Sequence, residues 1–354
     1  MTLKQRIVAR IETEGPIPFE IYQAMCLYDP DEGFFAAADD VRSSYGGDFL
    51  TSPELTAHFG RAVGRFVDDE MKLLPGDAQV VEVAAGSGSL LSALLEEAGH
   101  RDAYAVERSA VARDALSGTL SGDRVVGNLD QLPSASHRIT IANELIDNIP
   151  VALVVRTEDG WVEQLVGWSG TDFGFVYETP RDAVREWADR HAGAIEVGSQ
   201  AEVQIEAAQW LQHLIEDTES GTAIIFDYGG TTEELATRRT SGTLRTYRGH
   251  HLGPHPFDEP GKSDITVDVD FSALQLAAVD VGATCELIRQ DDFLTRWGLR
   301  DVMSRLRREE LEAARARDVM LQMRLRSERL DVETVLHPRG LGDFRVLIVR
   351  WAGR

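Results

Sequence analysis

Two glycines and two glutamates near the start of the chain have the types and spacing to bind a ligand that carries a ribose. The stretch VVEVAAGSGSL begins as an apolar run containing Glu82, passes through Gly86 and Gly88, and continues as a helical pattern. Glycines let the backbone come close to a ligand where side chains would block it. Glu107 ends the next apolar run about 20 residues later, where a carboxylate can accept both ribose hydroxyls.

The residues around the two glycines distinguish between the ligands that such a loop can hold. No lysine or arginine follows Gly88, which excludes a triphosphate-binding loop. Leu91 stands where a dinucleotide fingerprint has its third glycine, which disfavours NAD without excluding it. Glu82 followed by G-x-G-x-L resembles motif I of the class I S-adenosylmethionine-dependent methyltransferases, and an acid suits a cationic sulfonium. We therefore expect S-adenosyl-L-methionine, with adenine contacts from Asn128 and Leu129.

The pattern of elements predicts an α/β core that could position this loop. From residue 80 onward, short apolar runs alternate with helical stretches, which is typical of a parallel sheet wrapped by helices. Strand-like runs lie at 80–83, 103–106, 124–126, 139–142, 222–226, 284–289 and 344–351. A helical insertion separates the last two runs, which is compatible with an antiparallel final strand.

Three segments fall outside the minimal core. Residues 1–79 read as a helical N-terminal leader that packs on a core of residues 80–354. Residues 151–221 form a first insertion that opens with a hairpin turning at Asp159-Gly160. Residues 229–270 form a second insertion, read as a long loop rich in Gly, Thr, Arg and His. The Arg-rich stretch near the C-terminus is expected to be a helix that packs a Leu/Met stripe on the core.

Composition limits the partners and the compartment. The 59 acidic residues against 36 Lys and Arg give a net charge of −23, which repels nucleic acid and anionic membranes and attracts cationic partners. Cys26 and Cys285 are far apart, with no CxxC spacing and no clustered histidines, so neither a disulfide framework nor a metal site is expected. With no apolar run of membrane-span length and no signal-peptide pattern, we expect a soluble, cytoplasmic protein.

Several further motifs occur in a fixed order along almost the whole chain. They are GDFLTSPEL, VVEVAAGSGSL, ANELIDNIPV, FDYGG, GTLRTY, PGKSDITVDVDFSAL and DFLTRWGL. Together they resemble the MidA family, which includes a mitochondrial complex I assembly-factor methyltransferase. The resemblance implies a class I methyltransferase fold, a Rossmann-like doubly wound sheet, with S-adenosyl-L-methionine as cofactor and methylation of a protein arginine as activity. It also implies that GDFLTSPEL, with Thr51 and Ser52, lines the cofactor pocket.

The resemblance gives roles to the polar residues that follow the fourth and fifth apolar runs. Asn143, Glu144 and Asp147 follow the fourth run, and Tyr228 follows the fifth, at the carboxyl edge of the sheet where ligands bind. Carboxylates can hold a guanidinium bidentately and draw its charge from the attacking nitrogen. We expect catalytic roles for Glu144, Asp147 and Tyr228 and a cofactor contact for Asn143. The alternative for Glu144 is a loop cap or a cofactor contact.

The sequence departs from the family pattern at two places and leaves other functions open. Ala84 and Ala85 replace the usual glycine and proline, and Asp268 stands where relatives commonly carry histidine, which leaves substrate and mechanism open there. A small-molecule methyltransferase that grips an anionic substrate with Arg245, and a non-catalytic assembly factor, are the alternatives. The methyl acceptor is not identified, although an arginine-bearing subunit of a larger complex fits, and a homodimer is allowed.

Overall fold

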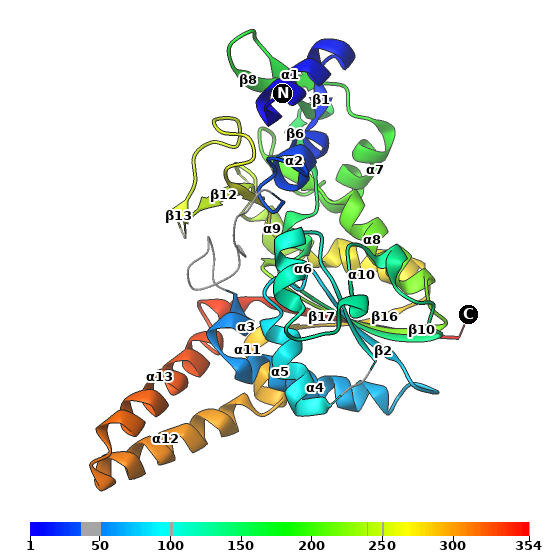
Figure 1. Cartoon of the computed structure of the whole chain (residues 1–354). Coiled ribbons are helices and arrows are strands. Elements are labelled where there is room, and N and C mark those ends of the chain that lie inside the picture. The colour runs from blue at the N-terminus through cyan, green and yellow to red at the C-terminus, as the bar shows by residue number, and fades with distance from the viewer. Residues whose placement is uncertain (37–50, 100–101, 239, 250, 354) are drawn as a thin grey trace. The chain divides into compact units, whose positions relative to one another are not determined.

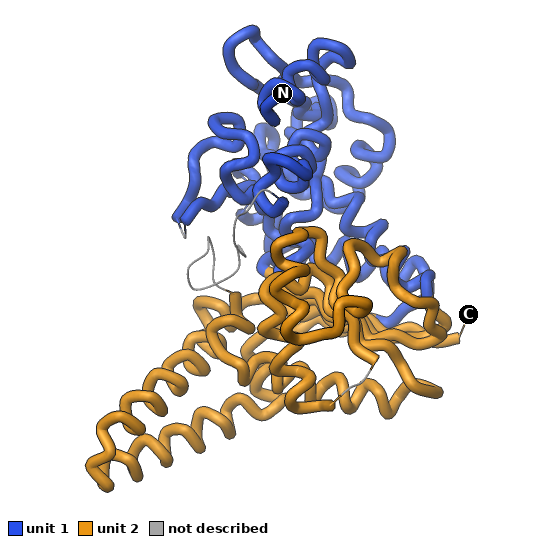
Figure 2. The backbone as a smooth tube through the Cα atoms, viewed as in Figure 1, with its two compact units in different colours: residues 1–42, 144–217, 228–284 blue, residues 43–143, 218–227, 285–354 orange. Residues whose placement is uncertain are grey.

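The chain folds into two compact units, each assembled from separate stretches of sequence (Figure 2). The computed structural model describes residues 1–36, 51–99, 102–238, 240–249 and 251–353. Unit 1 takes residues 1–42, 144–217 and 228–284, and unit 2 takes residues 43–143, 218–227 and 285–354. The division into a leader, a core and two insertions stays a prediction.

Unit 2 contains a seven-stranded sheet with the order β16-β17-β10-β5-β2-β3-β4. Its strands are β2 (Gln79–Val83), β3 (Ala103–Val106), β4 (Val125–Val126), β5 (His137–Asn143), β10 (Ser220–Asp227), β16 (Thr284–Arg289) and β17 (Arg345–Ala352). The pairings from β10 through β5, β2 and β3 to β4 are parallel, whereas β17 runs antiparallel to β10. Both the doubly wound α/β class and the antiparallel last strand expected from the sequence are confirmed.

Several helices of unit 2 accompany the sheet. They are α3 (Ser52–Leu55), α4 (Ala57–Met71), α5 (Ser89–Ala98), α6 (Ala110–Leu116), α11 (Gln290–Arg296), α12 (Leu299–Ala316) and α13 (Val319–Val335), with short 3₁₀ turns η1 (Gly122–Arg124), η2 (Leu129–Gln131) and η4 (Leu341–Asp343). A Cβ on Gly60 of α4 would lie 2.7 Å from Ala93 of α5, so glycine permits the close helix contact. Phe59, Phe226 and Phe293 pack edge to face in the core, which anchors α4 and α11 on β10.

The C-terminal helical segment is two helices rather than one. Arg317 adopts a left-handed conformation (φ 59°) that ends α12, and the Asp318 side chain accepts a hydrogen bond from Leu321 N to begin α13. In Figure 1 the pair, drawn in orange, extends from the sheet of its own unit. The predicted Leu/Met stripe includes the buried Leu306 and Leu325 and the partly buried Met303, which packs on the core, whereas Met320 and Met323 of α13 are exposed.

Unit 1 holds a separate five-stranded sheet of β1, β6, β7, β8 and β9 together with two smaller sheets. Its elements are α1 (Leu3–Glu14), β1 (Ile17–Pro18), α2 (Phe19–Tyr28), η3 (Ile146–Asn148), β6 (Ala152–Thr157), β7 (Gly160–Trp168), β8 (Phe173–Glu178), α7 (Asp182–His191), β9 (Gln200–Val203) and α8 (Ile205–Glu216). The predicted hairpin is present as β6 and β7. Because Thr157 pairs with Gly160, its turn is Glu158-Asp159, one residue earlier than predicted.

The segment 229–270 is not the irregular loop that its composition predicts. It contains β11 (Gly229–Gly230), α9 (Thr232–Ala236), β12 (Arg245–Arg248), β13 (His251–Leu252), β14 (Asp264–Thr266) and β15 (Val269–Asp270), and α10 (Phe271–Asp280) follows. β11 pairs with β15, and β12 pairs with both β13 and β14. The strands are too short for an alternating pattern. They form by pairing with a strand nearby in sequence, as β12 does with β13, or with a distant one, as β11 does with β15. Across the described ranges of both units, no helix has the length and apolarity to cross a membrane.

Candidate functional site

The loop after β2 is a tight backbone structure built on three residues with positive φ. Ala84, Gly86 and Gly88 have φ values of 56°, 53° and 76°. Ala84 N donates to Val106 O at 2.8 Å, which fixes the loop beside the end of β3. A Cβ on Gly88 would lie 2.5 Å from Leu116 Cδ2, so a side chain there would meet both strain and a clash. The loop therefore needs glycine at Gly88 for its geometry as well as for access.

Glu107 joins this loop to the end of β3. Its Oε2 accepts a hydrogen bond from Gly86 N at 2.9 Å, and its Oε1 accepts one from Ser109 N at 2.7 Å. Each carboxylate oxygen can accept a second hydrogen bond. The two oxygens therefore keep the capacity for the two hydroxyls of a ribose, and the residues present fit the nucleoside part of S-adenosylmethionine.

Glu82 is placed below the loop rather than at its surface. It is 3% exposed, and its Oε2 accepts a hydrogen bond from Leu91 N, 3.0 Å away in the first turn of α5. Burial raises the pKa of Glu82 to about 8, and the charge of Glu107 raises it as well. The hydrogen bond from Leu91 N acts in the opposite direction and lowers the pKa. This geometry supports a role in holding α5 on β2, and direct contact between Glu82 and the cofactor stays a prediction.

The described part of GDFLTSPEL starts a helix that is tied to the glycine loop. Thr51 is the N-cap of α3 and forms a capping box with Glu54, whose second oxygen accepts from Ser87 Oγ at 3.0 Å. Ser52 is buried, and its Oγ accepts from Gln290 Nε2 at 3.1 Å. Residues 47–50 lie outside the described part of the chain. Sequence reasoning missed Glu54, although the T-x-x-E pattern marks a capping box.

Asn128 and Leu129 follow β4 at the entrance to η2. Asn128 is exposed and Leu129 is half-buried. Asn128 O accepts from Gln131 N, and Gln131 Oε1 accepts from Gly127 N at 2.7 Å, so these hydrogen bonds join residues of the same turn. β4 lies next to β3, which ends at Glu107. Gln131 is a second residue that the sequence did not single out.

Asn143 and Glu144 lie at the end of β5. Asn143 is the last residue of the strand, and Glu144 follows it with a φ of 51°, a conformation that non-glycine residues rarely adopt. Both are half-buried. Backbone strain of this kind often accompanies functional sites, so the conformation of Glu144 agrees with a functional role without identifying it.

Asp147 and Tyr228 come together in unit 1. Tyr228 OH donates to Asp147 Oδ2 at 2.6 Å. The backbone of the β14–β15 segment holds both residues, since Val267 N donates to Asp147 O and Val269 N donates to Tyr228 O. Burial raises the pKa of Asp147 to about 6, partly offset by the hydrogen bond from Tyr228, and the charge of Asp268 raises it further. Asp147 is therefore a carboxylate that can exchange a proton near neutral pH.

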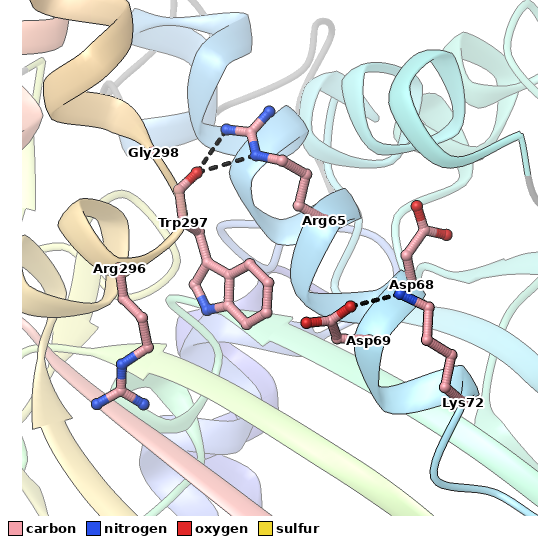
Figure 3. A pocket seen from close by; sticks show the side chains of 7 residues that line it. All are labelled: Arg65, Asp68, Asp69, Lys72, Arg296, Trp297 and Gly298. Carbon is pink, nitrogen blue, oxygen red and sulfur yellow. Dashed lines mark hydrogen bonds and ion pairs between the residues drawn. The ribbon is translucent and has the colours of Figure 1, made fainter.

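A hollow elsewhere in unit 2 contains none of the predicted residues. Figure 3 shows it between the end of α4 and the end of α11. Arg65 donates from Nε and Nη2 to the backbone oxygen of Trp297, and Lys72 is paired with Asp69. The lining residues are Arg65, Asp68, Asp69, Lys72, Arg296, Trp297 and Gly298. The bonds from Arg65 to Trp297 O hold α4 against the end of α11, so part of this lining serves helix packing. Among the described side chains, no group of three or more His, Cys, Asp or Glu could hold a metal ion.

Curated relatives match this chain over most of its length. It is 26% identical to the protein arginine methyltransferase NDUFAF7, mitochondrial, of Danio rerio over 97% of this chain and 88% of the relative. It is 27% identical to the NDUFAF7 homolog of Drosophila melanogaster over 83% of this chain and 74% of the relative. These relatives are named mitochondrial, which contradicts the expected cytoplasmic localisation.

A solved structure and a family model agree with the fold and the loop. The structure of a COG1565 superfamily member from Burkholderia thailandensis bound to S-adenosyl-homocysteine matches with a TM-score of 0.84 and 26% identity, over 99% of this chain and 92% of that one. The family model described as "Putative S-adenosyl-L-methionine-dependent methyltransferase" matches residues 62–288, more than half of the chain. The chain therefore belongs to this family, the MidA family of class I methyltransferases, and its cofactor is S-adenosyl-L-methionine.

Proposed function

We propose that this enzyme transfers a methyl group from S-adenosylmethionine to a guanidinium nitrogen of an arginine in a protein. The observation that carries the proposal is the buried Asp147 carboxylate, hydrogen-bonded by Tyr228 OH at 2.6 Å and close enough to Asp268 for their charges to interact. Two carboxylates with little exposure favour a cationic acceptor over an anionic one. The relatives that are named protein arginine methyltransferases also support an arginine as the acceptor.

The chain connects this cluster to the carboxyl edge of the sheet. Glu144 directly follows the last residue of β5, and Tyr228 directly follows the last residue of β10. In doubly wound folds ligands bind outside the carboxyl ends of the strands. We propose that Glu144 and Asp147 hold the acceptor guanidinium and that the Tyr228 hydroxyl orients Asp147.

The proposed cofactor contacts follow the glycine loop and its neighbours. Gly86 and Gly88 give the backbone access to the amino-acid part, and Glu107 accepts the ribose hydroxyls. The remaining proposed contacts are Thr51, Ser52, Glu82, Asn128, Leu129 and Asn143. The bonds of Ser52 to Gln290 and of Glu82 to Leu91 make these two residues supports of the pocket wall in this proposal.

The reaction is a displacement in which a guanidinium nitrogen bonds to the methyl carbon as the carbon–sulfur bond breaks. When bound, S-adenosylmethionine supplies the electrophilic methyl group. The acceptor nitrogen must lose one proton, and its pKa above about 12 makes loss to water costly. A carboxylate near the nitrogen lowers that cost by stabilising the charge and accepting the proton. Asp147, with a pKa raised to about 6, is suited to that transfer.

Methylation of arginine peptides by the purified full chain tests the proposal. We expect labelled methyl transfer to an arginine peptide, no transfer to the matched lysine peptide, and loss of transfer with Asp147→Asn while cofactor affinity is kept. Transfer to a small anionic metabolite that depends on Arg245 would overturn the arginine proposal. Cofactor binding with no methyl transfer to any lysate protein would favour an assembly role.

We extend the proposal to the partner. The acidic chain, with a net charge of −23, favours an acceptor arginine on a cationic segment, such as a subunit of a larger complex. A homodimer is also proposed, and the sedimentation coefficient of the purified chain tests it directly.

A further inference from the structure

Arg245 places a guanidinium group on a carboxylate next to the proposed acceptor residues. Arg245 Nη1 donates to Asp268 Oδ1 at 2.9 Å, and both residues belong to unit 1. The charge of Asp268 raises the pKa of Asp147, and the Tyr228 oxygen acts on Arg245, so all four groups share one electrostatic environment. An arginine of the chain is thus already bound to a carboxylate whose charge acts on Asp147, one of the two residues proposed to hold the acceptor guanidinium.

Asp268 is held by contacts that do not involve Arg245. Its backbone N donates to Thr243 Oγ1 at 3.0 Å, and its backbone O accepts from Gln204 Nε2 at 2.8 Å. Gln204 also accepts from Asp270 N, which fixes the following residue. The Asp268 carboxylate should therefore keep its position when Arg245 moves away.

The contact of Arg245 with Asp268 is suited to exchange. The Arg245 side chain is 41% exposed, whereas that of Asp268 is 7% exposed. A single nitrogen of Arg245 donates to the Asp268 carboxylate, whereas Arg181 binds Glu163 through Nε, Nη2 and its backbone N. Half-exposed, singly bonded pairs contribute little to stability, and a bidentate guanidinium binds a carboxylate more strongly. An incoming arginine that uses both nitrogens would win this competition.

Resting on the proposed function, we propose that Asp268 is the residue that selects a guanidinium-bearing acceptor, and that Arg245 is an internal competitor that the acceptor displaces. Arg245 keeps a low-exposure carboxylate paired while no acceptor is bound. An acceptor that lacks a planar guanidinium cannot make the bidentate contact with Asp268. It therefore cannot offset the free energy that is needed to displace Arg245. The pair therefore adds specificity for arginine over lysine at the cost of some affinity.

Binding of methylguanidinium chloride, measured by calorimetry on the full chain saturated with S-adenosyl-homocysteine, tests the proposal without catalysis. We expect Arg245→Ala to bind methylguanidinium about tenfold more tightly than the unaltered chain, because the competitor is gone. The double variant Arg245→Ala/Asp268→Asn should lose that gain. Arg248→Ala is the matched control, since Arg248 lies on the same strand and pairs with Glu259.

The outcomes separate this inference from the proposed function. No gain in Arg245→Ala, or a gain that survives Asp268→Asn, would overturn the inference even if arginine peptides are methylated. The expected binding pattern without methylation of any arginine peptide would overturn the proposed function instead. Where peptides are methylated, Arg245→Ala should lower KM about tenfold and change kcat little, whereas a purely structural pair would not lower KM. Thermal melting of each variant checks that it is folded.

Discussion

The glycine loop of unit 2 and the Asp147 cluster of unit 1 are built in different ways. The loop is held by its backbone N–H groups, since Gly86 N donates to Glu107 and Ala84 N donates to Val106 O at the end of β3. The cluster is held by side chains that are far apart in sequence, such as Tyr228 on Asp147. Every residue except proline has a backbone N–H donor, so these bonds need no particular side chain in the loop. The backbone conformation of the loop needs glycine, and the glycines therefore identify it in the sequence. The cluster depends on which side chains the fold brings together.

This difference predicts different consequences for substitutions in the two regions. A side chain added to the loop alters the path of the backbone and should remove cofactor binding. A change of one carboxylate in the cluster leaves the backbone in place and should remove methyl transfer alone. The two regions can therefore be tested separately by measuring cofactor affinity and turnover on the same variants.

Gly88→Val should give the largest effect. The new side chain would strain a residue with a φ of 76° and meet Leu116, so we expect cofactor affinity to fall at least about 100-fold while the chain stays folded. Gly99→Val is the matched control, because Gly99 ends the same helix with a φ of 66° and open space around it. Calorimetric titration with S-adenosylmethionine checks this. Near-normal affinity in Gly88→Val would contradict the site assignment.

Asp147→Asn should lower kcat about 100-fold and leave cofactor affinity within about twofold, because it removes a carboxylate and keeps an acceptor for Tyr228. In the unaltered enzyme the rate should rise with pH through about 6, as Asp147 loses its proton. Asp264→Asn is the control, since Asp264 is also buried but accepts a hydrogen bond from Asn148 Nδ2. Equal losses in both variants would mean that Asp147 is only structural.

The same contrast explains what the sequence could predict. The strands of the large sheet were placed within one or two residues, because buried parallel strands are continuous apolar runs that end at recognisable loops. The antiparallel β17 was expected from the helical insertion before it. The strands between 229 and 270 were missed, because runs of two to four residues are too short to show an alternating pattern. The bond between Glu54 and Ser87, and the pairing of Arg245 with Asp268, carry no local signal that could reveal them.

Glu82→Gln tests whether Glu82 acts as a neutral support beneath the loop. A folded-state pKa of about 8, above the ordinary 4.5, means that the folded chain holds this proton more tightly than the unfolded chain. The contribution of protonated Glu82 to the free energy of unfolding is fully present below about pH 4.5. It is lost as the pH rises through about 8. We expect the free energy of unfolding to fall by a few kcal/mol between pH 5 and 8 relative to Glu82→Gln.

Denaturant titrations at several pH values measure that difference. Glu96→Gln is the control, because Glu96 is an exposed carboxylate on the same helix as Leu91. Its stability should follow that of the unaltered chain at every pH. A Glu82→Gln variant with the same pH dependence as the unaltered chain would show that Glu82 is ionised in the folded state, which would restore an electrostatic role toward the sulfonium.

Ala84→Gly should give the smallest effect. It tests whether the glycine loop depends on its backbone conformation alone, in contrast to the Asp147 cluster, which depends on side chains. Ala84 has a φ of 56°, which costs an alanine about 1–2 kcal/mol, while glycine adds about 0.5–1 kcal/mol of chain entropy to the unfolded state. We therefore expect a stability gain of about 1 kcal/mol or less, measured by denaturant titration, with unchanged cofactor affinity. A loss of affinity would mean that the Ala84 methyl group contacts the ligand.

Since Glu144 has a similar φ of 51°, Glu144→Gly should relieve comparable strain but lower turnover, because its side chain is proposed to hold the acceptor.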